Sequence, residues 1–298
     1  MRYFSGAFCA FMGATALHAG PVTVETARGP VALEAGPLRV VTMDLAALDT
    51  ISALGGDVVG VPNGIKPDYL SQYSGDGYAE IGTFFEPDIE AIAALEPDLI
   101  IVSGRSQAKY DELAGLAPTI DLTPDPTAVI DSIHRNTRTL GAIYGREAEA
   151  EAALADLDAQ VADLHDLAED AGTALTVLTT GGRMSTHGAE GRFAVLYDAF
   201  GFAPAVTDIK AGNHGQPISN EFIRSSDPDW IFVIDRDAAI GRDGQPAAQM
   251  LDNPLVNDTR AAQSGQILYL DPVDWYIVGA SITAVENSVA QLSDALAQ

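Results

Sequence analysis

Residues 96–105 read EPDLIIVSGR, and residues 227–236, at a constant offset of 131 positions, read DPDWIFVIDR. Each stretch contains an acidic-Pro-Asp turn, an uninterrupted apolar run and a final arginine. At the same offset Glu90 falls on Glu221, and Ile92 falls on Ile223. An apolar run without polar alternation is typical of a strand that is buried on both faces of a parallel sheet. Because the two stretches and their flanks agree in phase, we expect two similar halves.

Strands and helices alternate around the first stretch. Apolar runs over residues 38–43, 58–61 and 99–102 are separated by segments with helical character over residues 44–54 and 86–95. Alternation at this spacing predicts an α/β fold with mostly parallel sheets.

The middle of the chain predicts one long helix. Residues 146–171 are rich in Ala, Leu, Glu and Asp, and Gly172 follows them. About 25 helical residues span about 38 Å, and this segment is too acidic to cross a membrane. We therefore expect an N-terminal α/β lobe over residues 37–144, a rigid linking helix over residues 145–171 and a C-terminal α/β lobe over residues 172–298. The carboxyl ends of the strands would then face a common ligand cleft.

The first residues have the pattern of an export signal. Arg2 precedes an uncharged run over residues 4–17, and small residues follow it. We expect a signal peptide over residues 1–19 and an irregular segment over residues 20–36; a buried N-terminal helix is the alternative. No lipoprotein-type cleavage box precedes Cys9, the single cysteine. The sequence therefore predicts a soluble, exported protein without a lipid anchor, and a mature chain without disulfides or thiolate sites.

Composition narrows the classes of partner. The chain has 298 residues, 47% of them hydrophobic, which argues against wholesale disorder. It has 16 Lys and Arg against 42 Asp and Glu, a formal net charge of −26. Such a field repels nucleic acid and anionic lipid. An anionic ligand would need a local cluster of cations, and most of the available cations are arginines.

Three arginines are candidates for such a cluster. Arg105 and Arg236 end the two duplicated strands, where each lobe would meet the cleft. Arg192 precedes an apolar helical segment, where a positive charge opposes the helix dipole. The alternative is that all three are surface arginines paired with carboxylates.

Four further candidates lie in predicted loops. His214 lies in a glycine-flanked loop, and Tyr276 follows the apolar run 267–270. Both residue types bind metal ions or donate hydrogen bonds to anions, although each is also common in purely structural roles. Trp275, next to Tyr276, is expected at the same site, and His187 is a weaker candidate in another loop.

The sequence lacks the common catalytic signatures. It contains no Gly-x-Ser-x-Gly elbow, phosphate-binding loop, dinucleotide fingerprint or His-Glu-x-x-His motif. This absence favours a binding protein over an enzyme.

Several phrases resemble a known family. Residues 81–82 (IG), 87–90 (PDIE) and 97–101 (PDLII) are similar to the periplasmic substrate-binding proteins of iron-siderophore ABC importers, in the class whose two lobes are bridged by a rigid helix. The more specific phrases resemble the branch that binds ferric catecholates of the enterobactin and petrobactin kind. These phrases are residues 212–215 (GNHG), 218–223 (ISNEFI), 232–236 (FVIDR), 270–272 (LDP) and 275–276 (WY).

The resemblance implies a role for each candidate. Arg105, Arg192 and Arg236 would hold the anionic complex, while His214 and Tyr276 would bind iron when the siderophore supplies only four donors. The acidic pair Glu90 and Glu221 would contact the ABC permease in the inner membrane. The ligand would be a ferric siderophore, with no permanently bound cofactor, and the protein would be a periplasmic monomer.

Three alternatives to this ligand remain at this stage. The same fold binds haem, corrinoids or hydroxamate complexes in related proteins. A different class would be an exported enzyme with His214 as general base.

Overall fold

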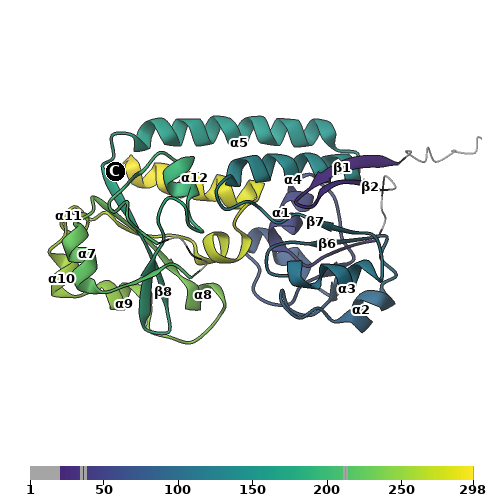
Figure 1. The fold of residues 1–298 in the computed structure, drawn as a ribbon, viewed down its shortest axis with the longest axis horizontal. Coiled ribbons are helices and arrows are strands. Elements are labelled where there is room, and N and C mark those ends of the chain that lie inside the picture. Colours follow the sequence, from purple (N-terminus) through teal and green to yellow (C-terminus); the bar gives the residue numbers. More distant parts are fainter. Residues whose placement is uncertain (1–20, 34–35, 37–38, 211, 213, 298) are drawn as a thin grey trace, which may run out of the picture.

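The computed structural model describes residues 21–33, 36, 39–210, 212 and 214–297. Two α/β lobes lie side by side beneath a long helix (Figure 1). The predicted signal peptide, including Cys9, lies outside the described residues. Among the helices that the structure describes, none combines the length and the apolar character needed to cross a membrane.

The N-terminal lobe contains a five-stranded parallel sheet in the order β5-β4-β3-β6-β7. Its strands are β3 (Val40–Thr42), β4 (Gly60–Val61), β5 (Ala79–Glu80), β6 (Leu99–Val102) and β7 (Thr119–Asp121). The helical elements around it are α1 (Leu45–Ala53), η1 (Asp68–Ser74), α2 (Ile89–Ala94), η2 (Gln107–Lys109) and α3 (Tyr110–Ala114). All four residues of β6 are buried, as the apolar run predicts.

The C-terminal lobe contains a mixed six-stranded sheet, in which β10 pairs beside the path β11-β9-β8-β12-β13. Its strands are β8 (Thr173–Thr180), β9 (Arg183–Thr186), β10 (Ala203–Pro204), β11 (Gln216–Ile218), β12 (Trp230–Asp235) and β13 (Ile267–Tyr269). The short helices are α6 (Val195–Asp198), α7 (Asn220–Ser226), α8 (Arg236–Ala239), α9 (Ala247–Leu251), α10 (Pro254–Asn257) and α11 (Arg260–Gln263). Strands β8, β10, β12 and β13 pair in parallel, whereas β9 pairs antiparallel with both β8 and β11. The predicted α/β class with mostly parallel sheets is confirmed.

The duplication extends to backbone detail. Asp88 caps α2 and Ser219 caps α7, each accepting a bond from a backbone N–H three residues later. Glu96 and Asp227 are the non-glycine residues with positive φ in the described chain, at 46° and 40°. All these pairs keep the offset of 131 positions found between residues 96 and 227. Each lobe therefore uses the same capped helix, left-handed turn and buried strand.

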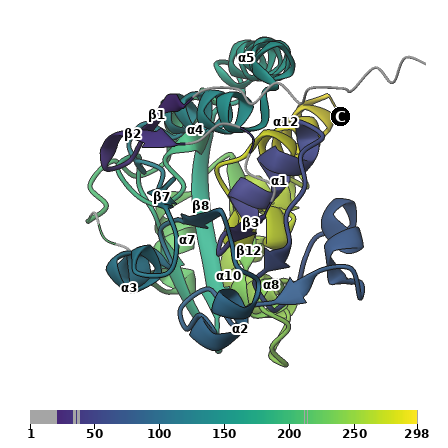
Figure 2. The same cartoon turned by 90° about the vertical axis from the view of Figure 1, so that its right-hand side faces the viewer.

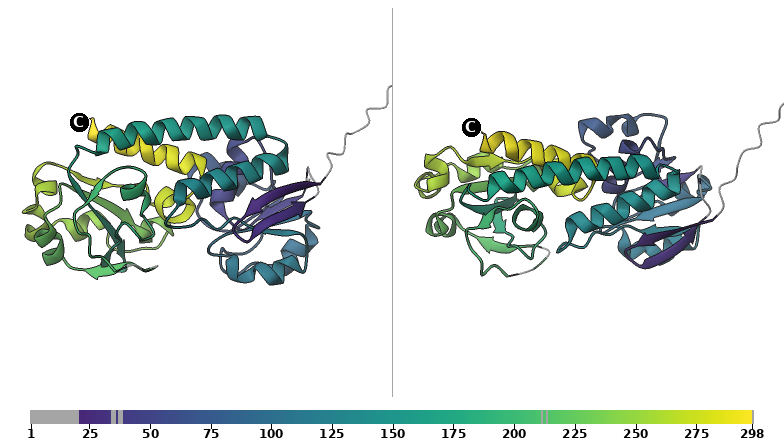
Figure 3. Two further views of the ribbon diagram at one scale, coloured as in Figure 1. Left: turned by 45° about the horizontal axis from the view of Figure 1, so that its top comes forward. Right: turned by 90° about the horizontal axis from the view of Figure 1, so that it is seen from above.

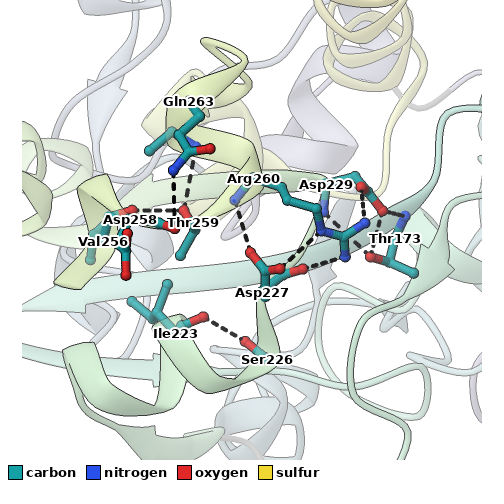
Figure 4. Close-up of polar contacts among 11 residues, drawn as sticks. Thr173, Ile223, Ser226, Asp227, Asp229, Val256, Asp258, Thr259, Arg260 and Gln263 are labelled. Atoms are coloured by element: carbon teal, nitrogen blue, oxygen red, sulfur yellow. Dashed lines mark hydrogen bonds and ion pairs between the residues drawn. The ribbon is translucent and has the colours of Figure 1, made fainter.

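The aspartate of each Pro-Asp turn ties its strand to a neighbouring strand. The carboxylate of Asp98 accepts a hydrogen bond from the Arg39 backbone N–H at 3.1 Å, and that of Asp229 accepts one from the Thr173 N–H at 2.8 Å. In the C-terminal lobe Arg260 also forms ion pairs with Asp227 and Asp229 (Figure 4). This network fixes the start of β12.

The lobes are joined by more than the one predicted helix. Helix α4 (Val129–Tyr144) ends at left-handed Gly145, and α5 (Glu147–Ala168) then runs along both lobes, close to the predicted bounds (Figures 1 and 3). The C-terminal helix α12 (Ile282–Leu296) lies beside α5. Its backbone N–H groups at Thr283 and Ala284 donate to Asp49 of α1, at 3.0 and 3.3 Å. The last helix therefore also anchors the C-terminal part of the chain to the N-terminal lobe.

The prediction of an irregular segment over residues 20–36 is wrong for most of its length. Strands β1 (Val22–Thr26) and β2 (Gly29–Leu33) form an antiparallel hairpin that packs on α4 (Figure 2). The Thr139 hydroxyl donates to the carbonyl of Glu25, and the Ala27 N–H donates to the carbonyl of Asp121 at 2.8 Å. The signal was the alternation of Val and Thr around a turn that ends in Gly29, whose φ is +98°.

Replacing Asp229 should destabilise the C-terminal lobe. Asp229→Ala leaves two donors of Thr173 and the Nη1 donor of Arg260 without their acceptor, so we expect a loss of about 1–3 kcal/mol in the free energy of unfolding. Urea denaturation followed by circular dichroism measures it. Asp170→Ala, at an exposed aspartate two residues after the end of α5, is the control. Equal midpoints for the two variants would contradict the role of this network.

Candidate functional site

A cavity of about 560 Å³, here called the arginine cavity, lies between the lobes at the carboxyl ends of β6 and β12. Its volume is in the range typical of small-ligand sites. The N-terminal lobe contributes residues such as Arg105, and the C-terminal lobe contributes Arg192, His214, Arg236 and Tyr276. The structure therefore brings five of the predicted site residues to one cavity.

A π-helical turn, Asp274–Val278, lies where the two lobes meet. It is closed by a hydrogen bond of 2.7 Å from the Gly279 N–H to the Asp274 carbonyl. Trp275 packs in the core of the C-terminal lobe, while Ile277 and Val278 pack in the core of the N-terminal lobe. Tyr276 lies between these anchors and faces the cavity. Turns of this kind are rare and frequent at functional sites.

The three arginines converge on Tyr276. Arg105 donates to the carbonyl oxygens of Tyr276 and Ile277, the latter at 2.9 Å. Arg192 donates to the Tyr276 carbonyl oxygen at 2.5 Å. Arg236 donates through Nε to the Tyr276 hydroxyl at 2.6 Å and through Nη1 to Thr180 at 3.1 Å. The guanidinium carbons lie 4.1–5.7 Å from the centre of the tyrosine ring, within cation–π range.

Within the part of the chain that the structure describes, no direct ion pair neutralises this cluster, although Asp44 acts electrostatically on Arg105 and Glu190 lines the cavity. Among the described residues, no carboxylate forms an ion pair with Arg105, Arg192 or Arg236. Burial lowers the pKa of the Arg105 guanidinium from its usual value, and the positive charge of Arg192 adds to the shift. The alternative of three surface arginines paired with carboxylates is therefore wrong. The cavity is a concentrated positive site in a strongly acidic protein.

The arginines also change the acidity of Tyr276. Burial by itself raises the pKa of the phenol, but the hydrogen bond from Arg236 and the charges of Arg192 and Arg236 outweigh it. The pKa of Tyr276 consequently lies below its usual value. A phenol that ionises more readily is a better donor for a hard cation.

Two further predicted site residues, His214 and Trp275, differ in exposure and in the cavity that they line. His214 is exposed and lines the arginine cavity from the C-terminal lobe. Trp275 is 6% exposed and packs near Phe193 and Phe200, with ring centres 6.3 Å apart in both pairs. It does not line the arginine cavity but a second cavity that adjoins it. Direct contact between Trp275 and a ligand in the arginine cavity thus stays a prediction.

Glu90 and Glu221 occupy equivalent places on the two lobes. Each is the second residue of its helix, α2 or α7, and each is exposed. The helix dipole favours an acidic residue at this position. Their equivalence follows from the duplication, while their role remains a prediction.

His187 contributes more than its sequence context indicates. The ring is 2% exposed, packs edge-on against Phe193 at 4.9 Å, and has no hydrogen-bond partner among the described residues. A Cβ on Gly215 would lie 2.7 Å from His187 Nε2, so the ring fills the space beneath the loop of His214. The packing of a glycine against a buried ring is a tertiary feature that the sequence does not reveal.

The chain belongs to the periplasmic binding protein family. The family's model matches residues 40–273.

The chain is similar to several siderophore-binding proteins. The chain is 36% identical over 263 residues to the petrobactin-binding protein YclQ of Bacillus subtilis, covering 87% of this chain and 83% of that protein. The crystal structure of YclQ superposes with a TM-score of 0.90 at 34% identity, over 94% of this chain and 100% of that one. The catecholate-siderophore binding protein VctP of Vibrio cholerae gives a TM-score of 0.87 at 36% identity, covering 92% and 99%. The ferric-anguibactin-binding protein FatB of Vibrio anguillarum is 34% identical over 274 residues, covering 89% and 84%.

The buried His187 should make stability depend on pH. Burial lowers its pKa to about 4, with the charges of Arg192 and His214 adding to the shift. The unfolded chain binds this proton near pH 6.5, so the contribution of His187 to stability falls as the pH drops from about 6.5 to about 4, by at most about 1.4 kcal/mol per pH unit. His187→Phe should remove that part of the slope.

Urea unfolding of the wild type and of His187→Phe at pH 7 and pH 4.5 measures the effect. His165→Phe on α5 serves as the matched control. Parallel pH slopes for the wild type and His187→Phe would show that His187 is protonated in the folded protein as readily as in the unfolded chain.

Proposed function

We propose that this protein captures an anionic ferric siderophore of the catecholate type in the periplasm and delivers it to an ABC permease for iron uptake. The observation that carries the proposal is the convergence of Arg105, Arg192 and Arg236 on one interlobe cavity with no carboxylate partner among the described residues. The named functions of YclQ, VctP and FatB support the same class of ligand. In this proposal the protein is exported by its signal peptide without a lipid anchor and acts as a monomer.

Charge matching explains the choice of ligand. Iron(III) held by three catecholates carries three negative charges, and three guanidinium groups neutralise them. Arginine suits catecholate oxygens because its planar donors are fixed in position and weakly hydrated. Each charge-assisted hydrogen bond contributes about 1.5–3 kcal/mol in such a setting. The acidic surface elsewhere opposes binding weakly, because salt screens exposed charges beyond about 8 Å.

Tyr276 and His214 would complete the coordination of iron when the siderophore supplies only four donors. Both line the arginine cavity, and the lowered pKa of Tyr276 supports a phenolate ligand. His214 is the softer donor and suits iron(III) less well. The iron is cargo in this proposal and not a resident cofactor.

The permease would be recognised through Glu90 and Glu221. Their equivalent, exposed positions on the two lobes support a contact that spans both lobes at once.

Catalysis finds less support. Among the described residues, His214 has no hydrogen-bonded acid that would orient it as a general base. The relatives named above are binding proteins.

Charge should decide which ferric complexes bind. We expect a ferric tris-catecholate to quench the tryptophan fluorescence and to bind at least about 100-fold more tightly than a near-neutral ferric tris-hydroxamate, because only the former matches the three arginines. Arg192→Gln should weaken the tris-catecholate by about 10–100-fold, while Arg224→Gln, an exposed arginine paired with Asp258, is the control. Haem and cobalamin are titrated in parallel. Tight binding of either one without binding of any catecholate would refute the proposal.

The denticity of the ligand should decide the role of Tyr276. Tyr276→Phe removes a potential iron ligand, so it should weaken a four-donor bis-catecholate complex by at least about tenfold more than a six-donor tris-catecholate complex. A charge-transfer band from phenolate to iron should appear with the four-donor complex only. Equal losses for both complexes would mean that the hydroxyl serves Arg236 and not the metal.

A further inference from the structure

A second cavity, of about 410 Å³, adjoins the arginine cavity and is here called the apolar cavity. The two cavities share Gly104, Arg105, Pro126, Arg192 and Tyr276. Away from this shared wall, the lining of the apolar cavity is mostly hydrophobic, and much of it comes from Val129, Val195, Phe193, Phe200, Ile277 and Val285. A cavity of this size and character, directly behind a charged site, is suited to an uncharged part of the same ligand.

The shape of the space favours an extended group. A third cavity, of about 270 Å³, shares Val129 and Val195 with the apolar cavity and continues to Val161 of α5. Neighbouring cavities therefore share wall residues, from the cavity of Arg236 to the one that reaches the linking helix. A flexible chain fills such a succession better than a compact ring system.

Gly104, which has no side chain, leaves space in the wall that the two cavities share. A Cβ on this glycine would meet no atom closer than Thr123 Cγ2, at 4.0 Å. The side of the wall at Gly104 therefore offers room for a chain to pass from one cavity to the other.

The polar groups around the apolar cavity argue against a second anion. Asp44 and Asp274 both line it. An uncharged group is therefore favoured in this cavity.

We propose that the native ligand carries an acyl chain, and that the chain lies in the apolar cavity while the iron complex lies in the arginine cavity. This inference rests on the proposed function and specifies its ligand class.

Two synthetic complexes test the proposal. They are the gallium(III) complex of a tris-catecholate chelator and the gallium(III) complex of the same chelator with an octanoyl group on its backbone. Gallium(III) keeps the charge of iron(III) without strong quenching. The wild-type protein should bind the octanoylated complex at least about tenfold more tightly, because burying each methylene group is favourable.

Filling the apolar cavity should remove this difference. Val129→Phe and Val195→Phe introduce rings at two half-buried positions that do not line the arginine cavity. The ratio of the two affinities, measured by calorimetry on each variant, should fall to about one. Val31→Phe, at a half-buried valine of the N-terminal hairpin, is the matched control and should keep the wild-type ratio.

A measurement on the wild-type chain does not depend on the folding of these variants. A bromine in the middle of the octanoyl chain should quench the fluorescence of Trp275, and the quenching should be lost in Trp275→Phe. Equal affinities of the two complexes for the wild type, or no quenching by bromine, would overturn the acyl site and leave the proposed function standing. Binding of neither complex would overturn both.

Discussion

The structure depends on holding three like charges around one tyrosine. Arg105, Arg192 and Arg236 come from two lobes, and burial together with the neighbouring positive charges disfavours the charged forms of Arg105 and Arg192. The fold offsets this cost with fixed dipoles: the Tyr276 and Ile277 carbonyls and the Tyr276 hydroxyl accept hydrogen bonds from the guanidinium groups. These acceptors are neutral, so they orient the arginines without neutralising them. The positive charge stays available for an anion.

The geometry of that cluster is set by elements that are remote from it. The duplicated left-handed turns at Glu96 and Asp227 start the strands that lead to Arg105 and Arg236. The π-helical turn is anchored in both hydrophobic cores, and α5 and α12 connect the lobes behind it. A change in the angle between the lobes would therefore separate Arg105 from the other two arginines. Because several independent links oppose such a change, the site is formed before a ligand arrives, which reduces the cost of binding.

The position of the arginines between the lobes explains how a strongly acidic protein can bind an anion. A net charge of −26 repels anions at long range, yet the proposed ligand is an anion. Exposed carboxylates are screened by salt, whereas the arginine cavity is partly shielded from water and keeps its field. Within the proposed site, the charge of the arginine cavity would select the iron complex, and the apolar cavity would select the group attached to that complex. Membership in the periplasmic binding protein family is consistent with a scaffold whose cleft varies while its frame is retained.

By itself, the sequence determined the α/β class, the duplicated halves, the long helix and the candidates Arg105, Arg192, Arg236, His214 and Tyr276. These features are encoded locally, since a Pro-Asp turn, an apolar run or an alanine-rich segment has the same preference wherever it occurs. The hairpin over residues 22–33 was locally encoded too, but its alternation is short and part of it faces solvent. Only the tertiary structure decided that the three arginines share Tyr276, that His187 is buried without a partner, and that Trp275 lines a second cavity. Such contacts join residues more than a hundred positions apart in some cases, and a local pattern carries no information about which distant surfaces will meet.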